Sequence, residues 1–376
     1  MTRIRVLITN HTLASRSGTE TYVRDLALGL LRRNHQPVVY SPELGPIARE
    51  LRHATVPVVD RIDQLGSRPD IIHGNDGPGL ISALLHFPGV PAAFFCHSWS
   101  ERPSQPPLFP RILRYVAVDE LCRDRVTAEN GVPDDRVRVL LNAVDLERFQ
   151  PRPPLPERPR RALMYRATPT ERSYVATLEA ACRRAGVELD VGRGGEATPE
   201  LLLRNYDLVF AKARCALEAL AVGTAVVLCD VVGSGPMVTA QELNDLRRLN
   251  LGRRTLRAPV DADLLSEQIA RYDPHDAAVV SSRIRETASR DALVDEILDL
   301  YREIADEYSG GTDGDLLPLE EARAAAAYIR DLNLAAKREV QLEFSLAFRT
   351  RLRRRAGIAG RLVSAGRWAR GRGLLR

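Results

Sequence analysis

The stretch FAKARCALEALAVGTAVVLCD, residues 210–230, alternates between the patterns of a strand, a short loop, a helix and a second strand. Gly223 separates the helix from the strand that follows, which is a common place for glycine. Strand–helix–strand units of this length are typical of α/β folds with parallel sheets. This stretch therefore predicts one crossover unit of such a fold.

Glu218 is the single carboxylate of the helical part of this stretch. Its neighbours there are apolar, namely Ala216, Leu217, Ala219, Leu220, Ala221 and Val222. A carboxylate this close to a core costs free energy unless it has a hydrogen-bond partner. Two explanations follow: Glu218 reaches solvent along a narrow polar stripe, or it faces a ligand.

The first half of the chain repeats the same alternation of strand-like and helix-like segments. The apolar runs are RIRVLIT (3–9), QPVVYS (36–41), PDIIHG (69–74), AAFFCHS (92–98) and RYVAVD (114–119). The clearest helical segment, TETYVRDLALGLLRRN, starts directly after Gly18. Such a pattern favours parallel strands joined by helical crossovers, hence a doubly wound α/β domain.

A proline-rich stretch, QPRPPLPERPRR, interrupts the alternation near residue 150, and its prolines predict a linker. The alternation resumes after it with RALMYRA (161–167), SYVATLEAACRRAG (173–186), VELDVGR (187–193) and TAVVLCD (224–230). We therefore predict two facing Rossmann-like domains. The predicted boundaries are residues 1–150 for the first domain, 151–161 for the linker, 162–290 for the second domain, 291–308 for a closing helix and 315–376 for a helical, arginine-rich tail.

Length and cysteine content agree with two domains in a reducing compartment. A chain of 376 residues exceeds one ordinary hydrophobic core. The five cysteines are scattered without a CxxC pair, which argues against a disulfide framework and a zinc site. The apolar run VLIT is too short for a secretory signal, and no run approaches the roughly 18 residues of a membrane span. We expect a cytoplasmic protein.

The net charge of +5 is concentrated at the C-terminal end. Residues 344–376 contain ten arginines and no acidic residue, interleaved with apolar side chains such as Trp368. Each basic residue near an anionic leaflet contributes about 1 kcal/mol to membrane binding. Nucleic acid would attract the same charges, but we expect no nucleic acid as a partner. The tail favours peripheral attachment to the inner face of the cell membrane, and a protein partner or no partner at all are the alternatives.

The turn from strand to helix at residues 210–214 has the chemistry of an anion site. Ligands of doubly wound sheets bind at the carboxyl ends of the strands. A helix N-terminus offers backbone N–H groups and a positive dipole end there, which suits phosphate. Lys212 and Arg214 add two positive charges at this point.

The order of these motifs resembles GT-B glycosyltransferases of the retaining, nucleotide-sugar-dependent family-4 type over about residues 1–308. Ser17-Gly18-Thr19-Glu20 resembles the glycine-rich loop of that family, and FFCHSW the strand that ends in a histidine beside the reacting sugar. RPDIIHGND and VLLNAVDLERF resemble two further family motifs. The resemblance implies that the first domain holds the acceptor, with Gly18 near the donor phosphate and His97 near the sugar.

The second domain resembles the donor side of that family. The resemblance assigns Arg166 and Arg172 to the clamp on the donor diphosphate. Lys212 and Arg214, which the charge at the helix N-terminus already indicated, are expected to be further donor-binding cations. Glu218, in LEALAVGTAVV, matches the second glutamate of the family's pair and would accept the ribose hydroxyls. The resemblance thus favours a ligand over solvent as the partner of Glu218.

Two residues and one loop depart from the family pattern. Phe210 stands where the first glutamate of the pair belongs, and Met237, in the expected loop GSGPMV, stands where glutamate is frequent. The loop 211–216, usually glycine-rich, contains no glycine. These departures keep open a catalytically silent nucleotide-binding or scaffold protein, and a nucleotide-sugar 2-epimerase is a further alternative.

The remaining polar candidates have structural explanations beside functional ones. His73 either lines the ligand side of its strand or is structural. Asp261 and Asp263 form a DxD motif, but a helix N-cap explains them, and we expect no metal and no cofactor apart from the nucleotide-sugar co-substrate. Asn142 and Asp145 are expected to fix a turn. The resemblance implies a hexosyltransferase with a glycan or lipid-linked acceptor in cell-surface polysaccharide or glycolipid synthesis.

Overall fold

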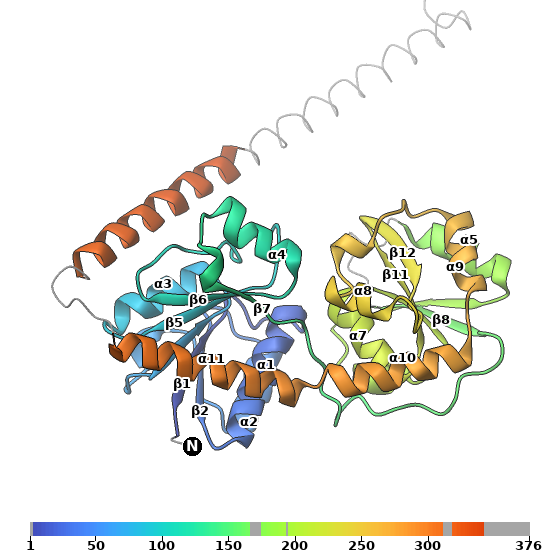
Figure 1. Ribbon diagram of the computed structural model, residues 1–376, viewed down its shortest axis with the longest axis horizontal. Helices are drawn as coiled ribbons and strands as arrows, with labels where there is room; N and C mark the ends of the chain where they lie inside the picture. Colours follow the sequence, from blue (N-terminus) through green and yellow to red (C-terminus); the bar gives the residue numbers. More distant parts are fainter. Residues whose placement is uncertain (1–2, 166–173, 193–194, 311–317, 342–376) are drawn as a thin grey trace, which may run out of the picture. The chain divides into compact units, whose positions relative to one another are not determined.

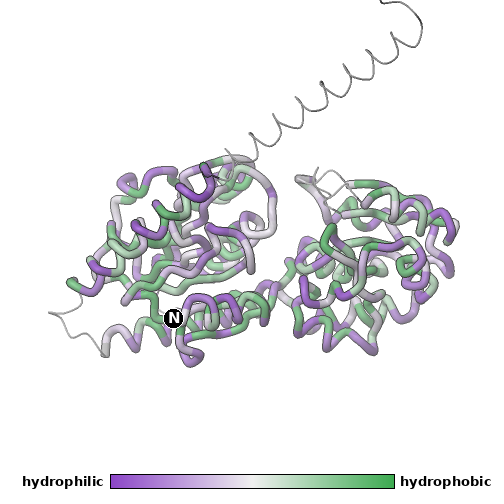
Figure 2. The backbone as a smooth tube through the Cα atoms, turned by 90° about the horizontal axis from the view of Figure 1, so that it is seen from above, coloured by the Kyte–Doolittle hydropathy of each residue, from purple (hydrophilic) through white to green (hydrophobic). Residues whose placement is uncertain are grey.

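The computed structural model describes residues 3–165, 174–192, 195–310 and 318–341. The chain divides into two compact units, Met1–Gly314 and Asp315–Arg376. The first unit contains a seven-stranded and a five-stranded sheet, each covered by helices (Figure 1). In Figure 2 hydrophobic segments run through the middle of each half of this unit, and hydrophilic segments lie along the outside.

The N-terminal sheet is entirely parallel, with the strand order β3-β2-β1-β4-β5-β6-β7. Its strands are β1 (Arg5–Thr9), β2 (Gln36–Tyr40), β3 (Val58–Val59), β4 (Ile71–Gly74), β5 (Ala92–Cys96), β6 (Ile112–Ala117) and β7 (Val137–Val139). The order reverses between β1 and β4, as in doubly wound folds. The predicted α/β fold class is confirmed.

Helices cover both faces of this sheet. They are α1 (Gly18–Arg32), α2 (Pro46–His53), α3 (Gly77–His86) and α4 (Glu120–Asp124). Val6 and Ile8 of β1 pack into one apolar cluster with α1 and α2, whereas Leu7, between them, lies on the opposite face because strand side chains alternate. The helix α3 contacts β4 and, less extensively, β1.

The C-terminal sheet has the order β12-β11-β10-β8-β9. Its strands are β8 (Arg161–Met164), β9 (Glu188–Val191), β10 (Leu208–Ala211), β11 (Ala225–Asp230) and β12 (Gly233–Met237). Its helices are α5 (Val175–Ala185), α6 (Pro199–Leu203), α7 (Ala213–Val222), α8 (Leu243–Arg248), α9 (Ala262–Ala270) and α10 (Pro274–Thr287). The linker expected at residues 151–161 has no helix or strand before Arg161.

The expectation of a loop at GSGPMV is wrong, because these residues include the edge strand β12. It pairs antiparallel with β11, and Met237 is opposite Val227. An edge strand tolerates Pro236, whose missing N–H group weakens a central strand but not an edge. The Met237 side chain is buried in the apolar cluster of this domain, so it does not stand in a ligand-binding loop.

The helix α11 (Arg290–Gly310) follows the C-terminal sheet in the chain and packs on the N-terminal one. It contacts α1 and β5, and it runs beside α1 in Figure 1. Val294, Ile297 and Tyr301 are buried in the apolar cluster of the N-terminal sheet. The chain therefore crosses twice between the two sheets, once through the linker and once before α11.

The described part of the second unit is a helix over residues 318–341. None of the helices in the described ranges is long and apolar enough to cross a bilayer. The arginine-rich residues 344–376 lie outside the described residues.

Candidate functional site

His97 lies at the carboxyl edge of the N-terminal sheet, directly after β5. Its Nε2 atom is 2.8 Å from Oδ1 of Asn75, which follows β4, and the Nδ2 group of Asn75 donates to the Thr9 carbonyl oxygen at 3.0 Å. Burial, and then the positive charge of Arg214, lowers the pKa of His97 to about 3. His97 is therefore neutral near pH 7 and acts through hydrogen bonds rather than through charge.

His73 is enclosed by aromatic side chains and has a structural role. Its Nδ1 atom is 2.7 Å from the hydroxyl of Tyr301 on α11, and its ring stacks on Phe95 at 3.8 Å. The side chain is fully buried, and burial lowers its pKa well below the ordinary value. Of the two explanations considered for His73, the structure favours the structural one.

The N-terminus of α1 is organised by Glu20, which is fully buried. Its carboxylate accepts hydrogen bonds from the backbone N–H of Ser17 at 2.6 Å and from the hydroxyl of Ser15 at 2.6 Å. A Cβ atom built on Gly18 would have no neighbour within 4 Å. The first turn of α1 therefore has open space in front of Gly18, where a ligand could approach.

The turn between β10 and α7 is short and strained. Lys212 is its single residue between the strand and the helix, and Ala213 has a φ of 47°. This left-handed conformation is unfavourable for a residue with a Cβ atom and is enriched at functional sites. The Ala213 N–H group donates to the Leu251 carbonyl oxygen at 2.7 Å, which holds the turn in place.

Four buried side chains form a charge cluster that joins α1 to α7. We call Arg24, Asp25, Arg214 and Glu218 the buried charge cluster. Nε of Arg214 donates to Glu218 at 3.0 Å, another Arg214 nitrogen pairs with Asp25, and Arg24 pairs with the second oxygen of Asp25 at 2.6 Å. Glu218 is completely buried and also accepts from the Tyr165 hydroxyl at 2.9 Å.

The cluster is balanced, with two guanidinium and two carboxylate groups. Burial opposes the charge on Arg214, but Asp25 and Glu218 raise its pKa above the ordinary value. Burial likewise opposes the charge on Asp25, and its arginine partners lower its pKa. Arg24, Asp25 and Arg214 are therefore charged at neutral pH, and each depends on the others.

In the described part of the chain a small hollow lies beside the cluster. A hollow of about 10 Å³ lies against Tyr22, Asp25 and Arg214, which is about the room that one water molecule needs. A ribose could therefore reach Glu218 only if side chains of the cluster moved.

Lys212 lies beside the cluster at the solvent-accessible edge. Its ammonium group pairs with Asp230 at the end of β11, and its side chain is 41% exposed, in contrast to 4% for Asp230. Arg214 and Lys212 thus adjoin the same helix N-terminus, one inside the protein and one at its surface.

The other predicted residues divide into three groups. Arg166 and Arg172 lie outside the described residues. Phe210 is buried in the apolar cluster that also contains Met237, so neither replaces a polar sugar-binding group. Asp261 caps α9 by accepting from the N–H group of Asp263, as the sequence predicted, and Asp145 accepts from Arg148 N–H within a turn.

Sequence reasoning did not identify Asp25, Asn75 or Tyr165. The signal for Asp25 was present, because it is a carboxylate within an apolar helical stretch, as Glu218 is. Tyr165 and Asn75 have no comparable signal, since a tyrosine and an asparagine at strand ends are common in turns and edges.

Comparison with known proteins identifies the fold. Residues 16–148 match Glycosyltransferase Family 4. A glycosyltransferase from Rickettsia africae ESF-5 superposes with a TM-score of 0.59 at 13% identity, covering 81% of this chain and 99% of that chain. Anabaena HepE in complex with UDP and glucose gives 0.58 at 14% identity, covering 80% and 100%.

These structural likenesses establish the GT-B fold, and the resemblance predicted from the sequence is confirmed. No match was found among curated protein sequences.

Proposed function

We propose that this chain, whose residues 16–148 match Glycosyltransferase Family 4 and whose fold is GT-B, transfers a hexosyl group from a nucleotide-sugar to an acceptor. The turn from β10 to α7 carries the proposal. It combines a helix N-terminus, the surface cation Lys212 and the pair Arg214–Glu218, all within seven residues of the chain. Such a group can bind a nucleoside diphosphate through its phosphates and its ribose.

UDP-glucose is the first donor to test. Anabaena HepE is described in complex with UDP, with UDP and glucose, and with UDP-glucose. In our proposal Glu218 accepts the ribose hydroxyls of such a donor after its bond to Arg214 opens. Arg214 then remains paired with Asp25 and faces the diphosphate.

The proposed chemistry is electrostatic stabilisation of the leaving group. Cleavage of the sugar–phosphate bond leaves negative charge on the nucleoside diphosphate, and positive groups aimed at that charge lower the barrier. Arg166, Arg172, Lys212 and the N-terminus of α7 would supply them. His97, neutral and with its Nε2 proton donated to Asn75, would orient the sugar hydroxyls through Nδ1.

The acceptor is proposed to bind at the carboxyl ends of β1 and β4. Asn10, directly after β1, is fully buried, and its Oδ1 atom has no hydrogen-bond partner within the described ranges. Asp76, after β4, is also buried, and burial raises its pKa to about 6. The side-chain oxygen atoms of Asn10 and Asp76 suit the hydroxyl groups of a saccharide. We propose that the acceptor is a lipid-linked saccharide or a growing cell-surface polysaccharide.

A catalytically silent nucleotide-binding protein is the second candidate. It is favoured by the burial of Phe210 and Met237, because neither position offers a carboxylate to a hexose hydroxyl. Turnover distinguishes the two candidates. Donor hydrolysis is the safest assay because it does not depend on knowing the acceptor, and a His97→Ala variant should slow it without weakening nucleotide binding.

The donor site is tested by a thermal-shift screen of UDP, GDP and ADP with their sugars, followed by calorimetry. Ligand at a hundredfold excess over its dissociation constant stabilises the fold by about 2.7 kcal/mol. For the nucleotide found, Glu218→Gln should weaken binding by about 1–3 kcal/mol, since a charged hydrogen-bond acceptor is lost.

Glu267→Gln is the matched control, because Glu267 is an exposed residue of α9. Unchanged affinity in a folded Glu218→Gln variant would remove Glu218 from the donor site. Binding of none of the nucleotides would contradict the proposed function as a whole.

Attachment of residues 344–376 to an anionic membrane is part of the proposal. Ten arginines without an acidic residue support it, because a basic segment is attracted to an anionic leaflet. The full chain should cosediment with anionic vesicles at low salt, and a chain that ends at Gln341 should not. Equal sedimentation of the two proteins would exclude the tail as the anchor.

A further inference from the structure

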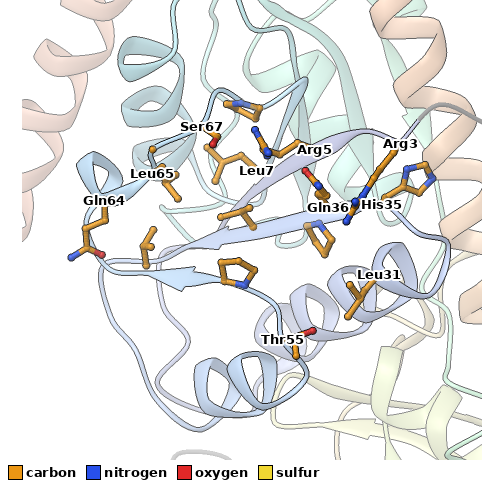
Figure 3. Close-up of a pocket in the computed structure, with 16 residues that line it drawn as sticks. Arg3, Arg5, Leu7, Leu31, His35, Gln36, Thr55, Gln64, Leu65 and Ser67 are labelled. Atoms are coloured by element: carbon orange, nitrogen blue, oxygen red, sulfur yellow. The ribbon is translucent and has the colours of Figure 1, made fainter.

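A second hollow lies at the amino ends of the strands, at the opposite edge of the N-terminal sheet from His97. It encloses about 430 Å³, which is within the usual range of small-molecule sites. Figure 3 shows its lining: side chains of β1 and β2 from one side, and the segment that contains Gln64, Leu65 and Ser67 from the other.

The floor of this hollow is apolar. Leu7, Val38 and Val59 lie on neighbouring strands and on the sheet face opposite α1 and α2. Strands are about 4.8 Å apart, so three of them make a floor about 10 Å wide, enough for one or two rings. Pro57 and Leu65 extend the apolar lining at its sides.

The hollow carries positive charge without a matching acid. Arg3 precedes β1 and Arg5 is its first residue, and the residues that line the hollow include no aspartate or glutamate. Within the described ranges, neither guanidinium pairs with a carboxylate. Arg5 donates to the Arg68 carbonyl oxygen at 3.3 Å, and the nearby Asp70 carboxylate accepts from the Arg5 backbone N–H at 2.6 Å.

His35 adds a buried donor to this lining. Its Nδ1 atom accepts from the Ile4 N–H group at 3.3 Å, so the ring proton is on Nε2. His35 is only 4% exposed, and its Nε2 atom is buried. This atom has no hydrogen-bond partner in the described part of the chain. A buried donor without an acceptor is uncommon, and a ligand oxygen would satisfy it.

We propose that this hollow is a binding site for a small organic anion, a phosphate monoester or carboxylate carried on an aromatic or aliphatic body. The two guanidinium groups would hold the anionic end, because arginine matches carboxylate and phosphate oxygens in pairs. The apolar body would lie on Leu7, Val38 and Val59. In Figure 3 the Gln36 side chain lies between Arg3 and Arg5 and could accompany them.

The test uses the full chain and phenyl phosphate as the probe, with calorimetry as the measurement. The arginines of residues 344–376 and the proposed donor site also attract phosphate. Binding of phenyl phosphate to the wild-type protein is therefore compared with its binding to variants of the hollow. Arg3→Gln with Arg5→Gln should weaken phenyl phosphate binding about tenfold or more, as expected for lost charge-assisted hydrogen bonds.

Arg49→Gln is the matched control, an exposed arginine on α2, and should leave binding unchanged. Phenol and inorganic phosphate test the two ends of the probe, and both should bind more weakly than phenyl phosphate. Equal binding by the double variant, or equal binding of either fragment, would overturn the proposal. Nucleotide binding is unaffected in either case, so this result is independent of the proposed function.

Discussion

Two strand-to-helix turns, one in each domain, use opposite solutions for the same position in the fold. The turn from β1 to α1 spans residues 10–17, is capped by Ser17 and Glu20, and ends in open space at Gly18. The turn from β10 to α7 has one residue between its elements, contains Ala213 with a φ of 47°, and has its cations paired with carboxylates.

The difference shows which groups of each turn are available to a ligand. At Gly18 the backbone itself is accessible, so a ligand could reach the helix N-terminus without any side chain moving. At Arg214 the side chains already satisfy one another, so a ligand has to replace a partner within the buried charge cluster. The first turn is thus suited to direct approach, and the second to binding that is coupled to rearrangement.

Removing the charge of Arg214 should have the largest effect on this contrast. Arg214→Met leaves Asp25 and Glu218 buried with less compensation, and breaking a buried ion pair costs about 3–5 kcal/mol. We expect a loss of this size in the free energy of unfolding measured with urea. Arg248→Met, on an exposed residue of α8, should change it by less than about 0.5 kcal/mol.

A double variant sharpens this result. Arg214→Met combined with Glu218→Gln removes the carboxylate charge that the loss of Arg214 leaves unpaired, while Asp25 stays paired with Arg24, and should recover part of the lost stability. A small cost for Arg214→Met alone, below about 1 kcal/mol, would mean that the cluster opens readily to solvent.

The pH dependence of stability gives a second measure of the Arg214→Met substitution, through the pKa of His97. Its folded-state pKa, about 3, is below the roughly 6.5 of an unfolded histidine, so the unfolded state binds more protons between these values. The contribution of His97 to stability is therefore complete above pH 6.5 and is lost as the pH falls towards 3. Because Arg214 is one cause of the low pKa, Arg214→Met should make this loss shallower.

Periodicity predicted most of the fold because parallel strands buried on both faces are continuous apolar runs. The runs at β1, β2, β4, β5 and β6 were all recognisable in this way. The edge strand β12 was not, because its sequence, GSGPM, has the composition of a turn. What makes it a strand is its pairing with β11 and the burial of Met237, and neither is visible in a local pattern.

The candidate site was predictable only in part, for a related reason. Glu218 was identified because a carboxylate in an apolar helix requires a partner, and the structure supplies Arg214 and Tyr165 as partners. The same reasoning applied to Asp25 would have suggested a second buried acid. That the two acids share one arginine depends on how α1 and α7 pack, which no sequence separation reveals.

Relieving the strain at Ala213 should have a smaller effect of the opposite sign. Glycine adopts positive φ without a steric cost, so Ala213→Gly should raise the free energy of unfolding by about 0.5–1 kcal/mol. The same substitution at Ala216, in the helical part of α7, should lower it by about 1 kcal/mol. Urea denaturation of both variants checks the pair, and a loss of stability in both would show that the turn is not strained.

Gly18→Ala should have the smallest effect on stability and a selective effect on binding. Gly18 is not among the residues with positive φ, and its added methyl group meets no atom within 4 Å, so the free energy of unfolding should change by less than about 0.5 kcal/mol. If donor phosphate approaches this helix N-terminus, the methyl group occupies part of its space and weakens nucleotide-sugar binding in calorimetry. Gly66→Ala is the matched control, since its methyl group also meets no atom within 4 Å but lies far from this turn, at the hollow of Arg3 and Arg5. Equal donor affinity in both variants would remove Gly18 from the donor site. Only the turn from β10 to α7 would then remain as a candidate for donor binding.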